Sequence, residues 1–286
     1  MENERRLTMI SLKFLRIATY TVLILTTLAL PVDGLAGCSR VIQVPVTAIG
    51  YSIIIQGDVV SGIYADLLRE LEKEGCQILF TTVPRARSEM MFKVGAADLL
   101  LPSTRTPQRD ELGLLIPLIK SRVTVISLAS DRPAITSAQD ILQRKELRLV
   151  LVRGFDFGPA YQSLVTEMTQ QGRVMLETDV VSVARMLKVS NNNITIMAPS
   201  SIVGAIKSDT RVQDLHDKFK FEPIDELPWV DAGIYISNTS LDKADREFLQ
   251  TALTRAAKSG IAWQSFKRSY SADLVKVSIR PPDNGR

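Results

Sequence analysis

Three short segments of the chain carry side chains suited to binding a small molecule. The first, Leu101–Arg109, places Ser103, Thr104 and Arg109 within nine residues. A guanidinium can hold a planar carboxylate through two parallel hydrogen bonds, and hydroxyl groups can complete such a site. The segment therefore indicates an anion site. A solvated turn in which Arg109 pairs with a neighbouring carboxylate fits the same residues.

The second segment, Gly154–Pro159, has the sequence GFDFGP and lies between a predicted strand and a predicted helix. Free backbone N–H groups at the start of that helix would face an anion, and a proline in the first turn removes only a spare amide. Gly154, Phe155 and Asp156 are therefore candidate ligand-binding residues. The aromatic residues also fit a purely apolar core.

The third segment, Met197–Ser201, contributes Ser200, which also fits a structural helix cap. All three segments follow predicted strands. In open α/β sheets, ligands bind beyond the carboxyl ends of the strands, where helix N-termini gather. We therefore expect the three segments to lie around one ligand.

Enzyme motifs are mostly absent from the sequence, and the spacing of its carboxylates selects no catalytic pair. The chain has one histidine and two cysteines, which excludes a multi-histidine metal centre, a zinc ribbon and an iron–sulfur cluster. His216 lies in the charged stretch DLHDKFK and is interpreted as a surface residue. No G-x-S-x-G, P-loop or H-E-x-x-H motif occurs. We expect no catalytic residue, no metal and no cofactor.

The composition is that of a globular protein. Of 286 residues, 45% are hydrophobic and 23% charged, and the net charge is +4. This length allows one large or two ordinary domains. No dense basic run is interleaved with aromatic residues, so a nucleic-acid partner is not expected.

The hydrophobic pattern alternates strands and helices, which predicts α/β architecture. Two α/β units joined by extended segments would form a hinge with a cleft between them. The predicted strands are 41–46, 52–55, 76–83, 97–101, 122–128, 147–152, 194–198 and 230–236. The predicted helices are 63–71, 88–95, one from about 158, 180–188, 200–206, 241–259 and 263–270.

The N-terminus has the pattern of an export signal. Basic residues precede a charge-free run over 17–32, and small residues follow it. This predicts a signal peptide over 1–37 and a periplasmic location. The run is shorter than the roughly 20 residues of a membrane span, although an uncleaved anchor remains an alternative.

The two cysteines allow two interpretations. Leu35–Cys38 resembles the bacterial lipobox, which would make Cys38 a lipid-anchored first residue. Cleavage after Ala36 fits as well, and a pair of cysteines in an oxidising compartment favours a disulfide between Cys38 and Cys76. Both interpretations remain open at this stage.

The order of these pieces resembles bacterial extracellular solute-binding protein family 3, the amino-acid-type receptors of ABC transporters. The motifs similar to those of the family are Ser61–Leu68, Gly95–Asp98 followed by Thr104, Thr106 and Arg109, the loop Gly154–Tyr161, and Lys258–Gly260 before Trp263 and Tyr270. The resemblance implies a two-lobed, periplasmic-binding-protein-like (type II) α/β fold. Each lobe would be a mainly parallel sheet flanked by helices, with lobe 1 over 38–121 plus 232–286 and lobe 2 over 122–231.

The resemblance also implies a function and site residues. The protein would be a monomer that binds a small carboxylate-bearing solute and delivers it to an inner-membrane ABC permease. Arg109 would hold the carboxylate, Thr104 and Ser103 would supply hydroxyl groups, and the loop around Asp156 would close from the other lobe. Arg85, Tyr51 and Ser200 complete the expected site. An enzyme on the same scaffold, such as a dehydratase, and a ligand-sensing protein are the alternatives.

Two departures from the family bear on the solute. Relatives place an acidic residue after the strand that here ends near Ala198, where it binds the ligand ammonium, whereas this chain has Pro199-Ser200-Ser201. Thr47–Gly50 also lacks the acidic residue that relatives carry there. The implied solute is an amino acid whose ammonium is held by Asp156 or Asp231, or a related organic anion without an amine.

Overall fold

The computed structural model describes residues 37–207 and 209–283. The predicted signal peptide, apart from Gly37, lies outside the described residues, as do Leu35 and Ala36 of the lipobox-like segment. Among the described residues, no helix is long and apolar enough to cross a membrane.

The first part of lobe 1 is a parallel strand pair covered by a helix. β1 (Ile42–Val46) pairs in parallel with β4 (Ile78–Thr82), and the chain between them forms the hairpin of β2 (Ile54–Gln56) and β3 (Val59–Ser61), followed by α2 (Ile63–Glu72). α2 buries its apolar face, Leu67, Leu68 and Leu71 included. The helix predicted over 63–71 is therefore present.

A four-stranded antiparallel sheet continues lobe 1, in the order β13-β6-β12-β5. Its strands are β5 (Leu99–Thr104), β6 (Gly113–Ser121), β12 (Val230–Ser237) and β13 (Ile279–Arg280). α3 (Arg85–Lys93) packs on one face through Phe92, which contacts Tyr235 of β12. The other helices of this part are α4 (Pro107–Leu112), α9 (Lys243–Lys258) and α10 (Ile261–Ser269).

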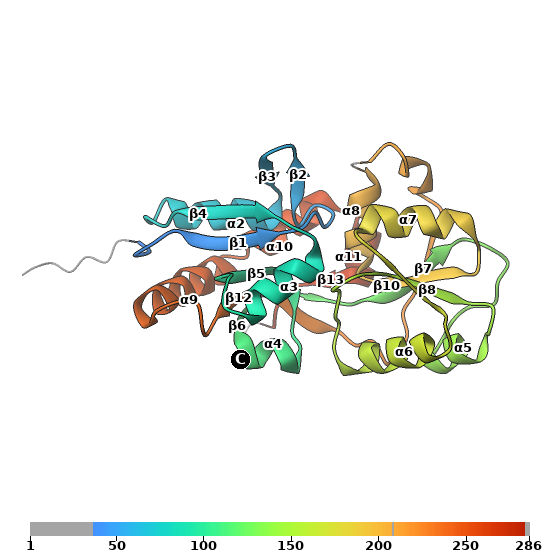
Figure 1. The fold of residues 1–286 in the computed structure, drawn as a ribbon. Coiled ribbons are helices and arrows are strands. Elements are labelled where there is room, and N and C mark those ends of the chain that lie inside the picture. Colours follow the sequence, from blue (N-terminus) through green and yellow to red (C-terminus); the bar gives the residue numbers. More distant parts are fainter. Residues whose placement is uncertain (1–36, 208, 284–286) are drawn as a thin grey trace, which may run out of the picture. The chain divides into compact units, whose positions relative to one another are not determined.

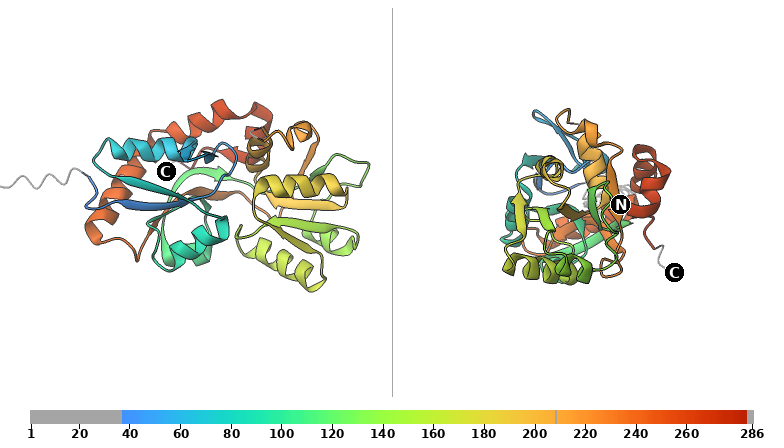
Figure 2. Two further views of the ribbon diagram at one scale, coloured as in Figure 1. Left: turned by 45° about the horizontal axis from the view of Figure 1, so that its top comes forward. Right: turned by 90° about the vertical axis from the view of Figure 1, so that its right-hand side faces the viewer.

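The second sheet has five strands in the order β11-β7-β10-β8-β9, all within the stretch predicted as lobe 2. They are β7 (Thr124–Leu128), β8 (Arg148–Val152), β9 (Val174–Glu177), β10 (Asn193–Met197) and β11 (Phe219–Glu222). Figure 1 shows α7 (Val180–Val189) on one face, with α5 (Ala138–Gln143) and α6 (Pro159–Gln170) on the other. The left view of Figure 2 shows the same layers.

The two-lobed α/β class is confirmed, but the sheets are mixed rather than mainly parallel. β1–β4 and β10–β8–β9 pair in parallel, whereas β6 and β12 pair antiparallel over their whole length. The reason is the chain path: β6 leads out of lobe 1 into β7, and β12 leads back from β11. Two segments that run in opposite directions can pair only as antiparallel neighbours.

α8 (Pro199–Lys207) contacts α11 (Ala272–Ser278), which lies far from it in the sequence. The backbone N–H of Ser200 on α8 donates to Oγ of Ser278 on α11, at 3.2 Å. Gly204 of α8 faces Gly50 so closely that a Cβ on Gly204 would lie 2.6 Å from the Cα of Gly50. A glycine is required there because any side chain would meet backbone.

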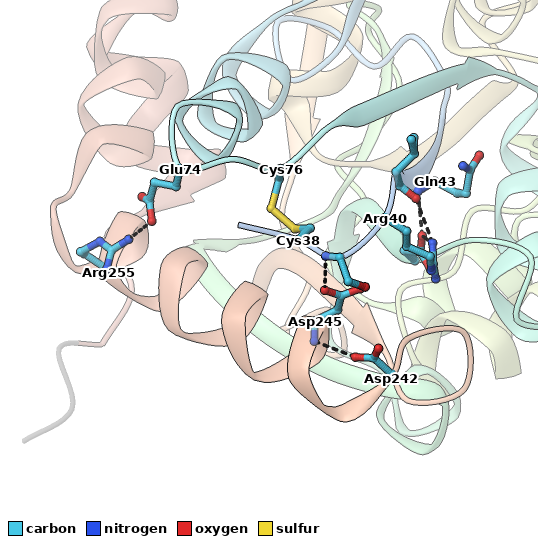
Figure 3. The surroundings of a disulfide bond; sticks show 11 residues. Cys38, Arg40, Gln43, Glu74, Cys76, Asp242, Asp245 and Arg255 are labelled. Carbon is cyan, nitrogen blue, oxygen red and sulfur yellow. Dashed lines mark hydrogen bonds and ion pairs between the residues drawn. A yellow bond between two sulfur atoms is a disulfide. The ribbon is translucent and has the colours of Figure 1, made fainter. Parts of the chain in front are cut away.

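A disulfide joins Cys38 to Cys76, with their Cα atoms 4.6 Å apart. It ties the segment before β1 to the turn between α2 and β4, as Figure 3 shows. Beside it, the backbone N–H of Ser39 donates to Asp245 of α9 at 2.7 Å. The predicted bridge is present, and a sulfur in this bond has no thiol left for lipid attachment.

Candidate functional site

One cavity is lined by residues of both lobes. Its volume is about 70 Å³, which is the liquid volume of roughly two water molecules. The predicted site residues that line it are Arg85, Ser103, Thr104, Arg109, Phe155, Asp156 and Ser200. Three segments that are far apart in the sequence therefore meet around one space.

Three other candidates lie elsewhere. The backbone N–H of Tyr51 donates to Oη of Tyr270, and Tyr51 borders a different surface depression. Gly154 does not line the cavity but packs against the backbone of Ala86. Asp231 also lies off the cavity lining and pairs with Arg105 at 3.4 Å. Asp231 is thus not placed to receive a ligand ammonium.

Arg109 is positioned by the first turn of α4. Thr106 caps this helix, since its Oγ1 accepts a hydrogen bond from the backbone N–H of Arg109, and Pro107 occupies the first turn. Such a cap fixes the helix start. The Arg109 side chain is thereby directed back over the end of β5, and its residue is 4% exposed.

The Arg109 guanidinium contacts both lobes. Its Nη1 donates to the carbonyl oxygen of Thr104 at 2.9 Å and to Thr104 Oγ1 at 3.2 Å. Nη1 also donates to the carbonyl oxygen of Asp156 in lobe 2, at 3.2 Å. The Thr104 hydroxyl donates to the same Asp156 oxygen at 3.2 Å. The residues expected to hold a solute therefore already bridge the cleft.

A second guanidinium lies beside the first. Arg85, at the start of α3, is 3% exposed and donates from Nη1 to the carbonyl oxygen of Pro102 at 2.8 Å. Both arginines bind Glu89, whose carboxylate lies 2.5 Å from Arg85 and 2.7 Å from Arg109. The site thus contains two cations and an internal carboxylate.

The charges in this cluster shift the pKa values of Glu89 and Arg85. Burial works to raise the pKa of Glu89, but the attraction of Arg85 and Arg109 outweighs it, so the pKa lies below its ordinary value. Burial, assisted by repulsion from Arg109, lowers the pKa of Arg85 against the opposing pull of Glu89.

Asp156 shapes the loop that closes the cavity from lobe 2. Its Oδ1 accepts a hydrogen bond from the backbone N–H of Gly158, and its Oδ2 accepts one from Gln162, both at 2.9 Å. The carboxylate is therefore engaged by Gly158, just before α6, and by the Gln162 side chain within α6, while the backbone carbonyl faces Arg109. Phe157 packs edge-to-face on Phe155 and on Tyr161, which holds the loop on the lobe 2 core.

Sequence reasoning missed several residues of the site. Ser52, Tyr64, Ser121 and Ser201 also line the cavity and add hydroxyl groups. Glu89 was missed because the helix was predicted to begin at Ser88, whereas α3 begins at Arg85. With the helix start moved, the i,i+4 spacing of Arg85 and Glu89 is a recognisable ion-pair signal.

No metal site accompanies this arrangement. Within 37–207 and 209–283, no group of three or more His, Cys, Asp or Glu side chains could hold a metal ion. His216 is exposed and lies 2.7 Å from Asp217 on the surface of lobe 2.

No family model and no curated protein matches the sequence, whereas solved structures match the fold. EhuB in complex with hydroxyectoine is similar with a TM-score of 0.64 and 14% identity, over 83% of this chain and 92% of that one. A putative L-cystine ABC transporter from Listeria monocytogenes is similar with a TM-score of 0.62 and 15% identity, over 82% of this chain and 97% of that one. The GluR0 ligand-binding core in complex with L-glutamate is similar with a TM-score of 0.61 and 14% identity, over 82% of this chain and 100% of that one.

These likenesses define the class of fold. The chain has the two-lobed α/β fold of the substrate-binding proteins of amino-acid ABC transporters. The resemblance drawn from the sequence motifs is thus matched by the fold. At 10–15% identity these similarities establish the fold alone, so the function must be inferred from the residues of the site.

Proposed function

We propose that the protein is a solute-binding receptor that holds a small carboxylate-bearing solute between lobes 38–121 plus 232–286 and 122–231. The supporting observation is the meeting of Arg109 and Thr104 of lobe 1 with the Asp156 carbonyl of lobe 2 at one cavity. Charge-assisted hydrogen bonds from a guanidinium are strong and suit a carboxylate.

Binding in this proposal requires the lobes to part. A cavity of about 70 Å³ is smaller than the pockets of roughly 300–1,000 Å³ that enclose drug-sized ligands. When the loop of Asp156 moves away, Arg109 Nη1 and the Thr104 hydroxyl lose their acceptor and become donors for the solute. Closure around the solute then restores the contact between the lobes.

The chemistry of the cavity favours an organic anion over an α-amino acid. Asp156 is the acidic residue among those that line the cavity, and its carboxylate oxygens are bound to Gly158 and Gln162. A solute ammonium would therefore meet hydroxyl groups and carbonyl oxygens but no free carboxylate. Burying a cation without a paired anion is costly.

The wider setting follows from the same proposal. The signal-peptide pattern over 1–37 would export the protein to the periplasm, where a Cys38–Cys76 disulfide is stable. EhuB, which shares the fold, is described in complex with hydroxyectoine, and another structure with this fold is a substrate-binding protein of an amino acid ABC transporter. We propose an ABC permease as the partner and a monomeric receptor.

A thermal-shift screen of amino acids and small carboxylates tests the proposal. We expect at least one compound to raise the melting temperature, to bind with 1:1 stoichiometry and to be recovered unchanged. A compound at 100 times its Kd adds about 2.7 kcal/mol to stability, which is readily measured. Recovery of a converted compound would instead indicate an enzyme on this fold, and no shift with any compound would contradict solute binding.

A further inference from the structure

The two arginines of the cavity share one carboxylate. Oε1 of Glu89 accepts hydrogen bonds from Nε of Arg85 at 2.9 Å and from Nη2 of Arg109 at 2.7 Å. Oε2 of Glu89 accepts a longer bond from Nε of Arg109 at 3.3 Å. Glu89 therefore lies across the Nε–Nη2 edge of Arg109.

That edge is one of the positions from which arginine binds a carboxylate with two parallel bonds. The opposite side of the guanidinium donates from Nη1 to backbone oxygens of Thr104 and Asp156. A solute carboxylate that arrives at Arg109 therefore competes with Glu89 on one side and with backbone carbonyls on the other. The protein already holds a carboxylate in a position suited to the ligand's anionic group.

Burial makes this internal carboxylate necessary. The side chains of Arg85 and Arg109 are 4% and 5% exposed, and that of Glu89 is 24% exposed. Two nearby guanidiniums that are shielded from water repel each other and require a counter-charge. Glu89 contacts the two arginines from outside the cavity lining, and the carboxylate that does line the cavity, Asp156, is engaged with Gly158 and Gln162. Glu89 is the acidic side chain that contacts both arginines.

We propose that Glu89 is a built-in counter-ion that occupies the anion position of the Arg85–Arg109 pair and thereby sets how strongly the cavity binds a solute carboxylate. This inference rests on the proposed function, because it deepens the account of the same site. A solute must share or displace Glu89. The residue then determines affinity and selectivity between anionic and neutral solutes without being the primary ligand contact.

The test is rescue of Glu89→Ala by acetate. Removing the side chain leaves space and two uncompensated cations, so the melting temperature should fall by roughly 10 °C. Acetate at about 100 mM should restore several degrees, because it can occupy the vacated anion position. Acetamide, a neutral molecule of the same shape, and sodium chloride of equal ionic strength should not.

The matched control is Glu70→Ala on α2. Glu70 is also a helical glutamate with a cationic partner, Lys73 at 2.8 Å, but both side chains are at least half exposed. Its melting temperature should change little, and acetate should add no more than it adds to the wild type. Equal rescue of Glu89→Ala by acetamide, or no rescue by acetate, would overturn the inference.

A second variant covers the case in which Glu89→Ala does not fold. Glu89→Gln keeps the volume and removes the charge, so a carboxylate solute of the wild-type protein should bind about tenfold more tightly, equivalent to 1.4 kcal/mol. Unchanged affinity would overturn the role of Glu89. If the wild type binds no solute, the proposed function fails, while the acetate experiment still decides whether this anion position exists.

Discussion

Nη1 of Arg109 donates to the main-chain carbonyl oxygen of Asp156 at 3.2 Å, and these two residues belong to different lobes. The contact uses a side chain from lobe 1 and only backbone from lobe 2. A backbone carbonyl keeps this role whatever side chain the loop carries, provided that the loop keeps its shape. In the proposed receptor, solute binding and lobe closure would therefore depend on the same guanidinium.

Replacing Arg109 should strongly weaken solute binding. In Arg109→Ala the carboxylate loses its charged donor, and we expect affinity to fall by about 100-fold. Stability should also fall, by roughly 3 kcal/mol, because Glu89 loses one of two buried partners. Isothermal titration and thermal melts measure the two effects.

Arg105→Ala is the control for that experiment. Arg105 lies four residues away on the same segment, but its side chain is 46% exposed and pairs with Asp110 and Asp231 outside the cavity. It should bind solute like the wild type and lose little stability. If both variants kept wild-type affinity, the solute would not be held by Arg109.

The close approach of Gly154 to lobe 1 should be needed for closure. Gly154 has φ +89°, and a Cβ there would lie 2.6 Å from the backbone of Ala86. Gly154→Ala should therefore hold the loop away from α3, weaken solute binding by tenfold or more and raise the radius of gyration of the complex in small-angle scattering.

Gly158→Ala separates this clash from backbone strain. Gly158 lies in the same loop with φ +95°, but a Cβ there would have nothing within 4 Å. Both variants place a side chain at positive φ, which costs on the order of 1–3 kcal/mol, so both melting temperatures should fall, whereas only Gly154→Ala should lose affinity. Equal affinities in the two variants would show that the contact with Ala86 is irrelevant to binding.

The disulfide should make a large contribution to stability. The Cys38–Cys76 bond closes a loop with a sequence separation of 38, which is worth about 4 kcal/mol in the chain-entropy model. Cys38→Ser/Cys76→Ser, or the wild type in reductant, should melt roughly 10 °C lower. Intact mass should show the loss of two hydrogens. A diacylglycerol mass on the exported protein, or no effect of reductant, would contradict the bridge.

The acid limit of stability should involve Glu222. Its buried carboxylate binds Arg132 at 2.6 Å, Lys220 at 3.1 Å and the backbone N–H of Ile135. Burial opposes ionisation, but these partners outweigh it and hold the pKa of Glu222 below its ordinary 4.5. A carboxyl whose folded-state pKa is depressed stabilises the fold above its unfolded pKa, and this stability is lost as pH falls through the folded pKa.

Denaturation at pH 3 to 7 measures this contribution. The free energy of unfolding should be flat above about pH 5 and should fall below about 4.5, with a shallower fall in Glu222→Gln. Glu167→Gln, at an exposed position of α6, should follow the wild-type curve. A Glu222→Gln curve parallel to that of the wild type would show that this carboxyl is not linked to folding.

Much of the fold was predictable because helices and buried strands have clear hydrophobic periods. The helix predicted over 63–71 corresponds to α2, and the strand predicted over 147–152 corresponds to β8. β6 was missed. Pro117 lies in the middle of β6, and a proline has no backbone N–H to donate, although this strand has neighbours on both sides. The pairing of β6 with β12 also shifts register at Gly233, the residue opposite Pro117.

The site was predictable only where one segment carries its own signal. The segment that carries Ser103, Thr104 and Arg109 indicated an anion site, and these three residues do line one cavity. Glu89 gave no such signal, because its role depends on a contact with Arg109 across 20 residues and two elements. Tyr51 was assigned to the cavity but packs on Tyr270, 219 residues away. Contacts of this kind arise from packing and leave no local pattern.

Hydrogen–deuterium exchange with and without the solute found by the thermal-shift screen tests the central claim most directly. The account predicts that one solute slows exchange in both 102–109 of lobe 1 and 154–158 of lobe 2, and that Arg109→Ala abolishes both effects together. Protection confined to one of these segments, or centred on another part of the surface, would contradict a solute enclosed between the lobes.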